Sequence, residues 1–191
     1  MCIRDRIKDA QALELAHQVD TIAFDKTGTL TEGHPRLTLV EGVPGVDEVA
    51  VLKAAAALQA QSAHPLARAV LDAAHERGVV ADVAQDVQAV AGRGTTGTVQ
   101  GARLALGSLR WMDELGVPGL PLASALQGAQ AQGATVSLLA SQGADGRWSA
   151  LALLAFGDEP KAGAADAIAT LRAQGLRLFM VSGDNLSLIH I

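Results

Sequence analysis

The segment Asp25–Gly33, which reads DKTGTLTEG, places an aspartate directly before a lysine and adds three threonines and two glycines. It follows a short apolar run, Thr21–Phe24, which predicts a buried strand. A carboxylate at the carboxyl end of such a strand lies where open α/β sheets bind ligands. The turn offers backbone N–H groups and hydroxyls to a phosphate, and the acid can attack phosphorus or hold Mg²⁺. The segment predicts phosphoryl transfer; the alternative is an Asp that only caps a turn.

A second carboxylate follows a second predicted strand. The range Ala162–Gln174 predicts a helix, Leu176–Val181 a strand, and Ser182–Asn185 the turn after that strand. A strand, a crossover helix and a second strand predict parallel pairing with a right-handed connection. We therefore expect Asp25 and Asp184 to lie on the same edge of one sheet.

The middle of the chain has a different pattern, with two Ala- and Leu-rich helices followed by short strands separated by glycines. Such closely spaced strands favour antiparallel pairing. The expected helices are Val49–Ala60 and Leu66–Glu76, after a first helix around Asp9–Ala16, and the expected strands are Val87–Val90, Thr98–Gln100, Leu104–Leu106, Thr135–Ala140 and Trp148–Leu154. The order predicts an α/β phosphoryl-transfer domain that is interrupted by an inserted α+β domain.

Composition excludes several classes of function. The 191 residues carry a net charge of −5, so a nucleic-acid partner is not expected. The single cysteine, Cys2, gives neither a disulfide framework nor a CxxC metal site. No stretch reaches the roughly 18 apolar residues that a membrane helix needs. We expect the chain itself to be soluble.

The segment DKTGTLTEG resembles the phosphorylation motif of the P-type ATPases, which are cation pumps that form an aspartyl phosphate. Further motifs resemble the soft-metal (copper and zinc type) branch of that family, and they occur in the family's order. These motifs are Lys8–Glu14 (KDAQALE), Ser62–Ala67 (SAHPLA), Gly92–Gly97 (GRGTTG), Asp158–Lys161 (DEPK) and Ser182–Asn185 (SGDN).

The resemblance implies a haloacid-dehalogenase-like Rossmannoid phosphorylation domain, formed by residues 7–34 and 156–185 and incomplete here. An inserted α+β nucleotide-binding domain with an antiparallel sheet would span residues 35–155. Residues 1–6 and 186–191 fit the family poorly, and we leave them out of the fold prediction.

The function implied by the resemblance is ATP hydrolysis coupled to transport of a heavy-metal cation, with ATP and Mg²⁺ as cofactors. The parent protein would lie in a membrane, with this region on the cytoplasmic side and the cation bound by membrane segments outside these residues. The resemblance favours copper as the transported ion.

In the family, Asp25 would be the phosphorylated nucleophile. An ionised Asp needs no general base at neutral pH, because its reference pKa is about 3.9. Mg²⁺ would be bound by the Asp25 carboxylate and the Thr27 carbonyl, with a third ligand from a downstream Asp that is absent here. We therefore expect this chain alone to form little stable phosphoenzyme. Thr29 and Ser182 would donate hydroxyls to the phosphoryl group, and Lys26 is either part of the site or a solvent-facing charge.

Soluble phosphatases of this fold carry a second Asp, as general acid/base, where Thr27 stands. Without it, a phosphoenzyme should persist. The turn with Gly183 and Asp184 would orient the site or approach the ATP phosphates; the alternative is a plain Gly-Asp turn. Asp158 would open the returning helix, either as a catalytic residue or as ordinary compensation of the helix dipole.

The nucleotide would contact Gln59, Ser62, His64 and Pro65. His64 is either a group that stacks on adenine or the start of a helix with Pro65 in its first turn, and both can hold together. Two departures from the family remove negative charge from this site. Ala63 replaces the usual Glu, and Gln59 stands where many relatives have a Glu.

Gly92 and Gly94 would approach the nucleotide closely. The pattern GxGxxG also fits a Rossmann loop, but a strand-like segment follows it instead of a helix, so that interpretation fails. A hairpin fits better, and a plain turn remains an alternative. Two further functions stay open for the whole chain: a soluble haloacid-dehalogenase-type phosphatase or phosphotransferase, and a nucleotide-binding module without catalysis.

Overall fold

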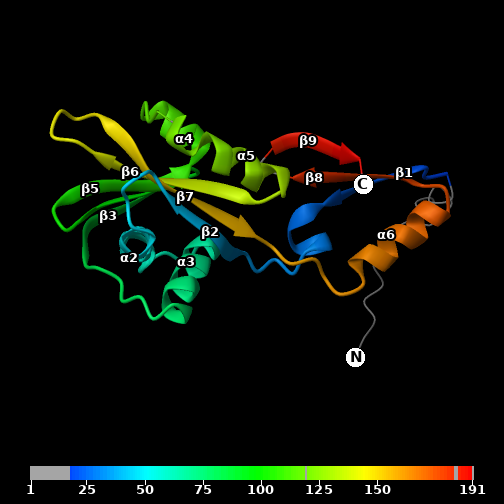
Figure 1. Cartoon of the computed structure of the whole chain (residues 1–191). Helices are drawn as coiled ribbons and strands as arrows, with labels where there is room; N and C mark the ends of the chain where they lie inside the picture. The colour runs from blue at the N-terminus through cyan, green and yellow to red at the C-terminus, as the bar shows by residue number, and fades with distance from the viewer. Residues whose placement is uncertain (1–17, 119, 183–184, 191) are drawn as a thin grey trace. The chain divides into compact units, whose positions relative to one another are not determined.

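The computed structural model describes residues 18–118, 120–182 and 185–190. Contacts divide the chain into two units, with boundaries between Gly33 and His34 and between Asp158 and Glu159 (Figure 1). One unit is therefore an insertion in the sequence of the other. The helix expected around Asp9–Ala16 and the residues Gly183 and Asp184 lie outside the described residues.

The inserted unit is built on one antiparallel sheet of six strands in the order β2-β7-β6-β5-β4-β3. Its strands are β2 (Arg36–Gly42), β3 (Ala84–Val90), β4 (Gly94–Val99), β5 (Ala102–Ser108), β6 (Thr135–Gln142) and β7 (Trp148–Gly157). The antiparallel pairing of this sheet confirms the prediction from the short, closely spaced strands.

Helices cover both faces of this sheet. Figure 1 shows α2 (Glu48–Gln59) and α3 (Pro65–Glu76) on one side, with α4 (Leu109–Glu114) and α5 (Ala123–Ala131) on the other. A short 3₁₀ turn, η2 (Leu120–Leu122), precedes α5. Because side chains alternate along a strand, neighbouring residues of β7 enter different cores: Leu154 packs with α2 and α3, and Leu153 packs with α4 and α5. Both leucines are fully buried.

The other unit carries a three-stranded sheet in the order β1-β8-β9. Its elements are β1 (Thr21–Asp25), the π-helical turn η1 (Lys26–Leu30), α6 (Ala164–Ala173), β8 (Arg177–Ser182) and β9 (Asn185–His190). Strands β1 and β8 pair in parallel from Thr21↔Arg177 to Asp25↔Val181, which confirms the predicted pairing of the two strands. The helix α6 contacts β8.

The structure differs from the sequence predictions in several elements. None of the residues of β1 is buried, although a buried strand was predicted; among the described residues, β1 lies at the edge of its sheet. Strand β2 and the helices α4 and α5 were not predicted. Residues 186–190, which we left out of the fold, form most of β9.

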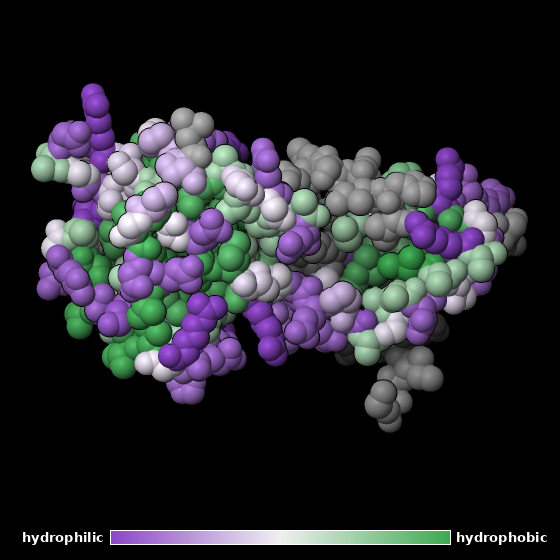
Figure 2. Space-filling view, viewed as in Figure 1, coloured by the Kyte–Doolittle hydropathy of each residue, from purple (hydrophilic) through white to green (hydrophobic). Residues whose placement is uncertain are grey.

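Most large apolar side chains are inside, and the four described ones that are most exposed are all valines. Val80 and Val83 are 80% and 81% exposed. They lie in the loop after α3, where an apolar area is visible at the lower left of Figure 2. None of the described helices has the length and apolarity to span a membrane.

Two glycines of the inserted unit give opposite predictions for stability. A methyl group at Gly107 would overlap the Trp111 ring and the Arg93 carbonyl, whereas one at Gly128, inside α5, would meet nothing within 4 Å. We expect Gly107→Ala to lower the free energy of unfolding by about 1–3 kcal/mol through overpacking. Gly128→Ala should raise it by about 0.5–1 kcal/mol through helix propensity. Urea denaturation of both variants checks this, and equal effects would contradict the packing described for Trp111.

Candidate active site

The carboxyl ends of β1 and β8 lie side by side. Asp25 is the last residue of β1 and pairs with Val181 of β8, and Ser182 is the last residue of β8. The parallel register therefore brings the two predicted catalytic segments to one edge of the sheet, and Asp25 is exposed there. The two catalytic candidates that follow Ser182, Gly183 and Asp184, are outside the described residues.

The turn after Asp25 has an unusual backbone. Lys26, Thr27 and Thr29 all lie in η1, a single π-helical turn, which is a rare geometry that often occurs at functional sites. Gly28 has φ +76°, and its N–H donates to Thr31 Oγ1 at 3.2 Å. Thr31 is only 5% exposed, so its hydroxyl fastens the turn from inside.

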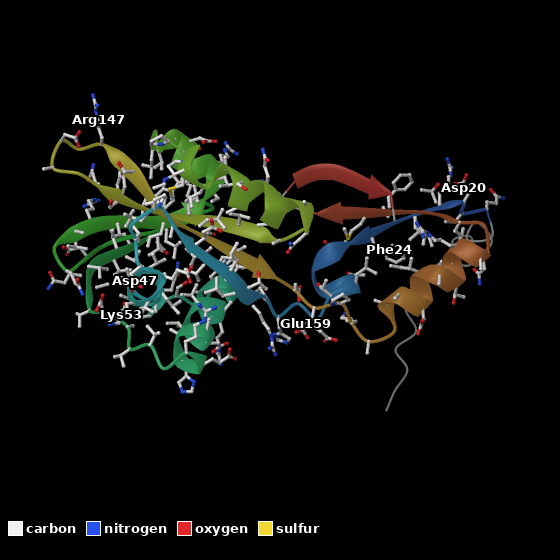
Figure 3. The ribbon with its side chains drawn as sticks, in the orientation of Figure 1. Asp20, Phe24, Asp47, Lys53, Arg147 and Glu159 are labelled. Atoms are coloured by element: carbon white, nitrogen blue, oxygen red, sulfur yellow. The ribbon has the colours of Figure 1, made fainter. Side chains whose placement is uncertain are left out.

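The returning chain holds the same turn from a second direction. Glu32 N donates to Glu159 O and Lys161 N donates to Leu30 O, both at 2.9 Å. The Lys161 ammonium donates to the carbonyl of Gly28. Figure 3 shows Phe24 near the end of β1 and Glu159 at the start of the returning chain. Lys161 therefore supports η1. The motif Asp158–Lys161 is visible in the sequence, but it does not predict this contact.

Asp158 does not open the returning helix, so this prediction was wrong. Helix α6 begins at Ala164, after Gly163 with φ +84°, because Pro160 is held in an isolated bridge with Thr31 and the chain turns before the helix starts. The Asp158 carboxylate instead accepts a hydrogen bond from His34 N at 3.2 Å. Asp158 therefore does not compensate the dipole of α6.

At the other end of β1, Asp20 forms an ion pair with Arg177 across the strand pair. Hydrogen bonds from the Thr21 hydroxyl and the Arg177 guanidinium lower the pKa of Asp20 below its ordinary value. Figure 3 places Asp20 at the start of β1, so this pair fastens the edge of the sheet opposite to Asp25.

His64 is the N-cap of α3, which confirms its predicted structural role. Its Nδ1 accepts a hydrogen bond from Leu66 N at 3.2 Å, and Pro65 is the first helical residue. The Ser62 hydroxyl accepts from His64 N at 3.3 Å. Because Nδ1 is the acceptor, the neutral ring carries its proton on Nε2, at the side away from the cap. The exposed imidazole keeps a face and a donor for a ligand.

Gln59 lies at the same corner of the inserted unit as His64. It is the last residue of α2, and its carbonyl accepts a hydrogen bond from Ser62 N at 3.0 Å. A tight turn therefore connects Gln59 to the cap of α3. The turn between α2 and α3 therefore holds the predicted nucleotide-binding residues Gln59, Ser62 and His64 close together.

The three glycines of the GxGxxG pattern have three different surroundings. Gly92 is in the turn of the β3–β4 hairpin, with φ +67°, and a side chain there would meet nothing within 4 Å. At Gly94 a methyl group would lie 2.8 Å from the Trp111 ring, and at Gly97 it would lie 2.8 Å from Leu58 Cδ2. The predicted hairpin is confirmed, and packing explains two of its glycines. Since Leu58 precedes Gln59, the contact at Gly97 also brings β4 against the end of α2.

Among the described residues, no group of three or more His, Cys, Asp and Glu side chains could hold a metal ion. The Mg²⁺ ligands named by the family resemblance, the Asp25 carboxylate and the Thr27 carbonyl, therefore stay a prediction. Hard oxygen donors of this kind suit Mg²⁺, and two of them leave most of its octahedral positions to water and phosphate.

Comparison with known proteins gives the family. The model of haloacid dehalogenase-like hydrolases matches residues 19–190. A copper-exporting P-type ATPase of Legionella pneumophila is 38% identical over 179 residues, which are 94% of this chain and 24% of that protein. The chain therefore spans about a quarter of the length of that relative.

Solved structures agree with this match. A zinc-transporting PIB-type ATPase in an E2.Pi state has a TM-score of 0.65 at 32% identity, over 87% of this chain and 26% of that one. The catalytic domain of the CPx-ATPase CopB-B, solved to follow conformational changes upon nucleotide binding, has a TM-score of 0.64 at 26% identity, over 94% of this chain and 59% of that one. The chain thus belongs to the haloacid dehalogenase-like hydrolases, and the relatives named here include a copper-exporting and a zinc-transporting P-type ATPase.

Proposed function

We propose that this chain is the ATP-binding and aspartyl-phosphorylation region of a P-type ATPase that moves a heavy-metal cation, with copper preferred, across a membrane. The observation that carries the proposal is the parallel register of β1 and β8, which puts Asp25 beside the end of β8. In the parent protein this region would lie on the cytoplasmic side. The relatives named above, which transport copper or zinc, support the cation class.

Asp25 is the proposed nucleophile. A carboxylate oxygen of Asp25 forms a bond to the γ-phosphorus of ATP, the bond from that phosphorus to the bridging oxygen breaks, and ADP leaves with the electron pair. An aspartate anion attacks without losing a proton, so the step needs no general base. Bound Mg²⁺ would offset charge between the phosphate and the carboxylate. The Asp25 carboxylate and the Thr27 carbonyl are the groups that would hold the ion.

The surroundings of Asp25 favour positioning over proton transfer. The turn is held by Thr31 from within and by Lys161 from the returning chain, so its backbone is fixed before a phosphate arrives. Such preorganisation is the main contribution of a protein to phosphoryl transfer. Thr29 and Ser182 are the proposed hydroxyl donors. With Thr27 at the position of the phosphatase acid, water has no activating group and the phosphoenzyme persists.

ATP is proposed to bind at the corner formed by Gln59, Ser62, His64 and Pro65, with Gly92 and Gly94 of the hairpin as further proposed contacts. The His64 imidazole would stack on the adenine, and Gly92 would allow close backbone approach. The exposed ring of His64 and the open space at Gly92 support this assignment.

A soluble phosphatase or phosphotransferase is the second candidate, because the family match by itself names a hydrolase. A nucleotide-binding module without catalysis is the third. Release of phosphate from a simple phosphomonoester by this chain would favour the second, and MgATP binding without any phosphate transfer would favour the third.

Replacing His64 by Asn separates its two roles, since Asn is also a good N-cap. We expect H64N to keep the thermal stability but to weaken MgATP binding at least fivefold, because stacking on a base is worth about 1–3 kcal/mol. Titration followed by amide chemical shifts gives both the affinity and the location, with shifts expected at Gln59, His64, Gly92 and Gly94. His75→Asn, on the last turn of the same helix, is the matched control and should bind like the unmodified chain.

Unchanged affinity in H64N would exclude the stacking role. Shifts that leave all four residues untouched would place ATP elsewhere.

Phosphorylation is tested with γ-³²P-labelled ATP and Mg²⁺. We expect acid-stable label well below one phosphate per chain, because one carboxylate and one carbonyl bind Mg²⁺ weakly. Asp25→Asn should remove this label, since the amide cannot accept the phosphoryl group. Asp166→Asn, at an exposed carboxylate on α6, should retain it. Label that persists in D25N would assign phosphorylation to another residue.

A further inference from the structure

The β3–β4 hairpin is fastened to the helix α4 by three kinds of contact, at its turn Ala91–Arg93 and at Gly94, which follows the turn. We infer that Glu114 and Trp111 of α4 are positioning residues, which hold this turn so that Gly92 is presented to the nucleotide. The inference rests on the proposed ATP site and adds two residues and a second helix to it. These residues lie on the face of the sheet opposite to α2 and α3 (Figure 1).

The first contact is an ion pair. Arg93 Nε donates to Glu114 Oε2 at 2.6 Å, and the two side chains are 47% and 36% exposed. Arg110 approaches the other carboxylate oxygen of Glu114 at 3.4 Å and is 89% exposed. The hydrogen bond from Arg93 lowers the pKa of Glu114, and Arg110 adds to the shift. Glu114 is therefore ionised at neutral pH and pulls the Arg93 guanidinium toward α4.

The second contact joins the backbones. The carbonyl of Arg93 accepts a hydrogen bond from Ser108 N at 2.9 Å. Ser108 is also the N-cap of α4, and its hydroxyl accepts from Trp111 N at 3.4 Å. The start of α4 is therefore fixed to the same residue, Arg93, whose side chain reaches the end of α4.

The third contact is the packing of Trp111 on glycine backbone. The indole is 5% exposed and lies over Gly94 and Gly107, which pair across β4 and β5. A side chain at either glycine would overlap the ring or the neighbouring strand. This packing explains why residue 94 is a glycine, and the indole supports β4, the strand that follows the turn.

These contacts leave one side of the turn open. A side chain at Gly92 would meet no atom within 4 Å. On the other face of the hairpin, Gly97 lies against Leu58, next to Gln59. With α4 holding one side, the turn leaves Gly92 open to a ligand while its own arginine is engaged with Glu114. Arg93 thus acts through its bond to Glu114 and sets the position of Gly92.

The experiment is a double-mutant cycle on the complete chain. MgATP affinity and the Gly92 amide shift are measured for Arg93→Gln, Glu114→Gln, the double variant and the unmodified chain, with thermal midpoints as the control for folding. Arg110→Gln is the matched control. Like Arg93→Gln, it removes one positive charge next to Glu114, but it leaves the hydrogen bond between Arg93 and Glu114. Arg93→Lys keeps a charged donor and tests rescue.

We expect R93Q and E114Q each to weaken MgATP binding about two- to fivefold, the range of an exposed ion pair. The double variant should be no weaker than either single variant, since both remove the same interaction. R110Q should match the unmodified chain, and R93K should recover most of the affinity. The Gly92 amide should shift in E114Q even without nucleotide.

Two results would overturn the inference while leaving the ATP site intact. One is an unmodified chain that binds MgATP and an E114Q variant that binds equally well. The other is weaker binding in R93Q with stronger binding in E114Q, which would make Arg93 a direct phosphate ligand released by the loss of Glu114. If the unmodified chain binds no MgATP, the proposed function fails, and the inference fails with it.

Discussion

The parallel pairing of β1 with β8 is the interaction on which the rest of the candidate active site depends. Parallel strands need a crossover, and in this chain the crossover contains the whole inserted unit as well as α6. The register Asp25↔Val181 makes the two strands end together, so the turns that follow them meet at one edge. A shift of a single residue would turn each side chain of β1 to the other face of the sheet.

Around this edge, the backbone carries most of the organisation. The turn η1 is held by Thr31 and by the returning residues 159–161, mainly through peptide groups. The corner of the inserted unit is organised in the same way, by the His64 cap and the bond from Ser62 N to Gln59 O. Both candidate sites are thus built at the ends of regular elements, where caps and turns pair the terminal N–H and C=O groups.

Local patterns made much of this predictable. An apolar run that stops at Asp25 predicted β1, and Ala- and Leu-rich periods predicted α2 and α3. The unpredicted elements have weak local signals: α4 has only six residues, too few for a helical period, and α5 has only nine residues, with Gly128 in its interior. Strand β2 has apolar residues at alternate positions, Leu37 and Leu39. It was not predicted because it directly follows Gly33–Pro35, which indicates a break in regular structure. The contact of Lys161 with Gly28 joins residues 133 positions apart, and no local pattern can indicate such a bond.

The bond between His34 and Asp158 has a consequence for how the outer unit folds. It joins the first and last residues of the inserted unit, so 125 residues enter and leave through neighbouring points. Once folded, such an insertion counts as a short loop for its host, because the entropy of closing a loop grows with the number of flexible residues and a folded insertion adds few of them. We therefore expect the pairing of the host's strands to depend little on the length of the insertion.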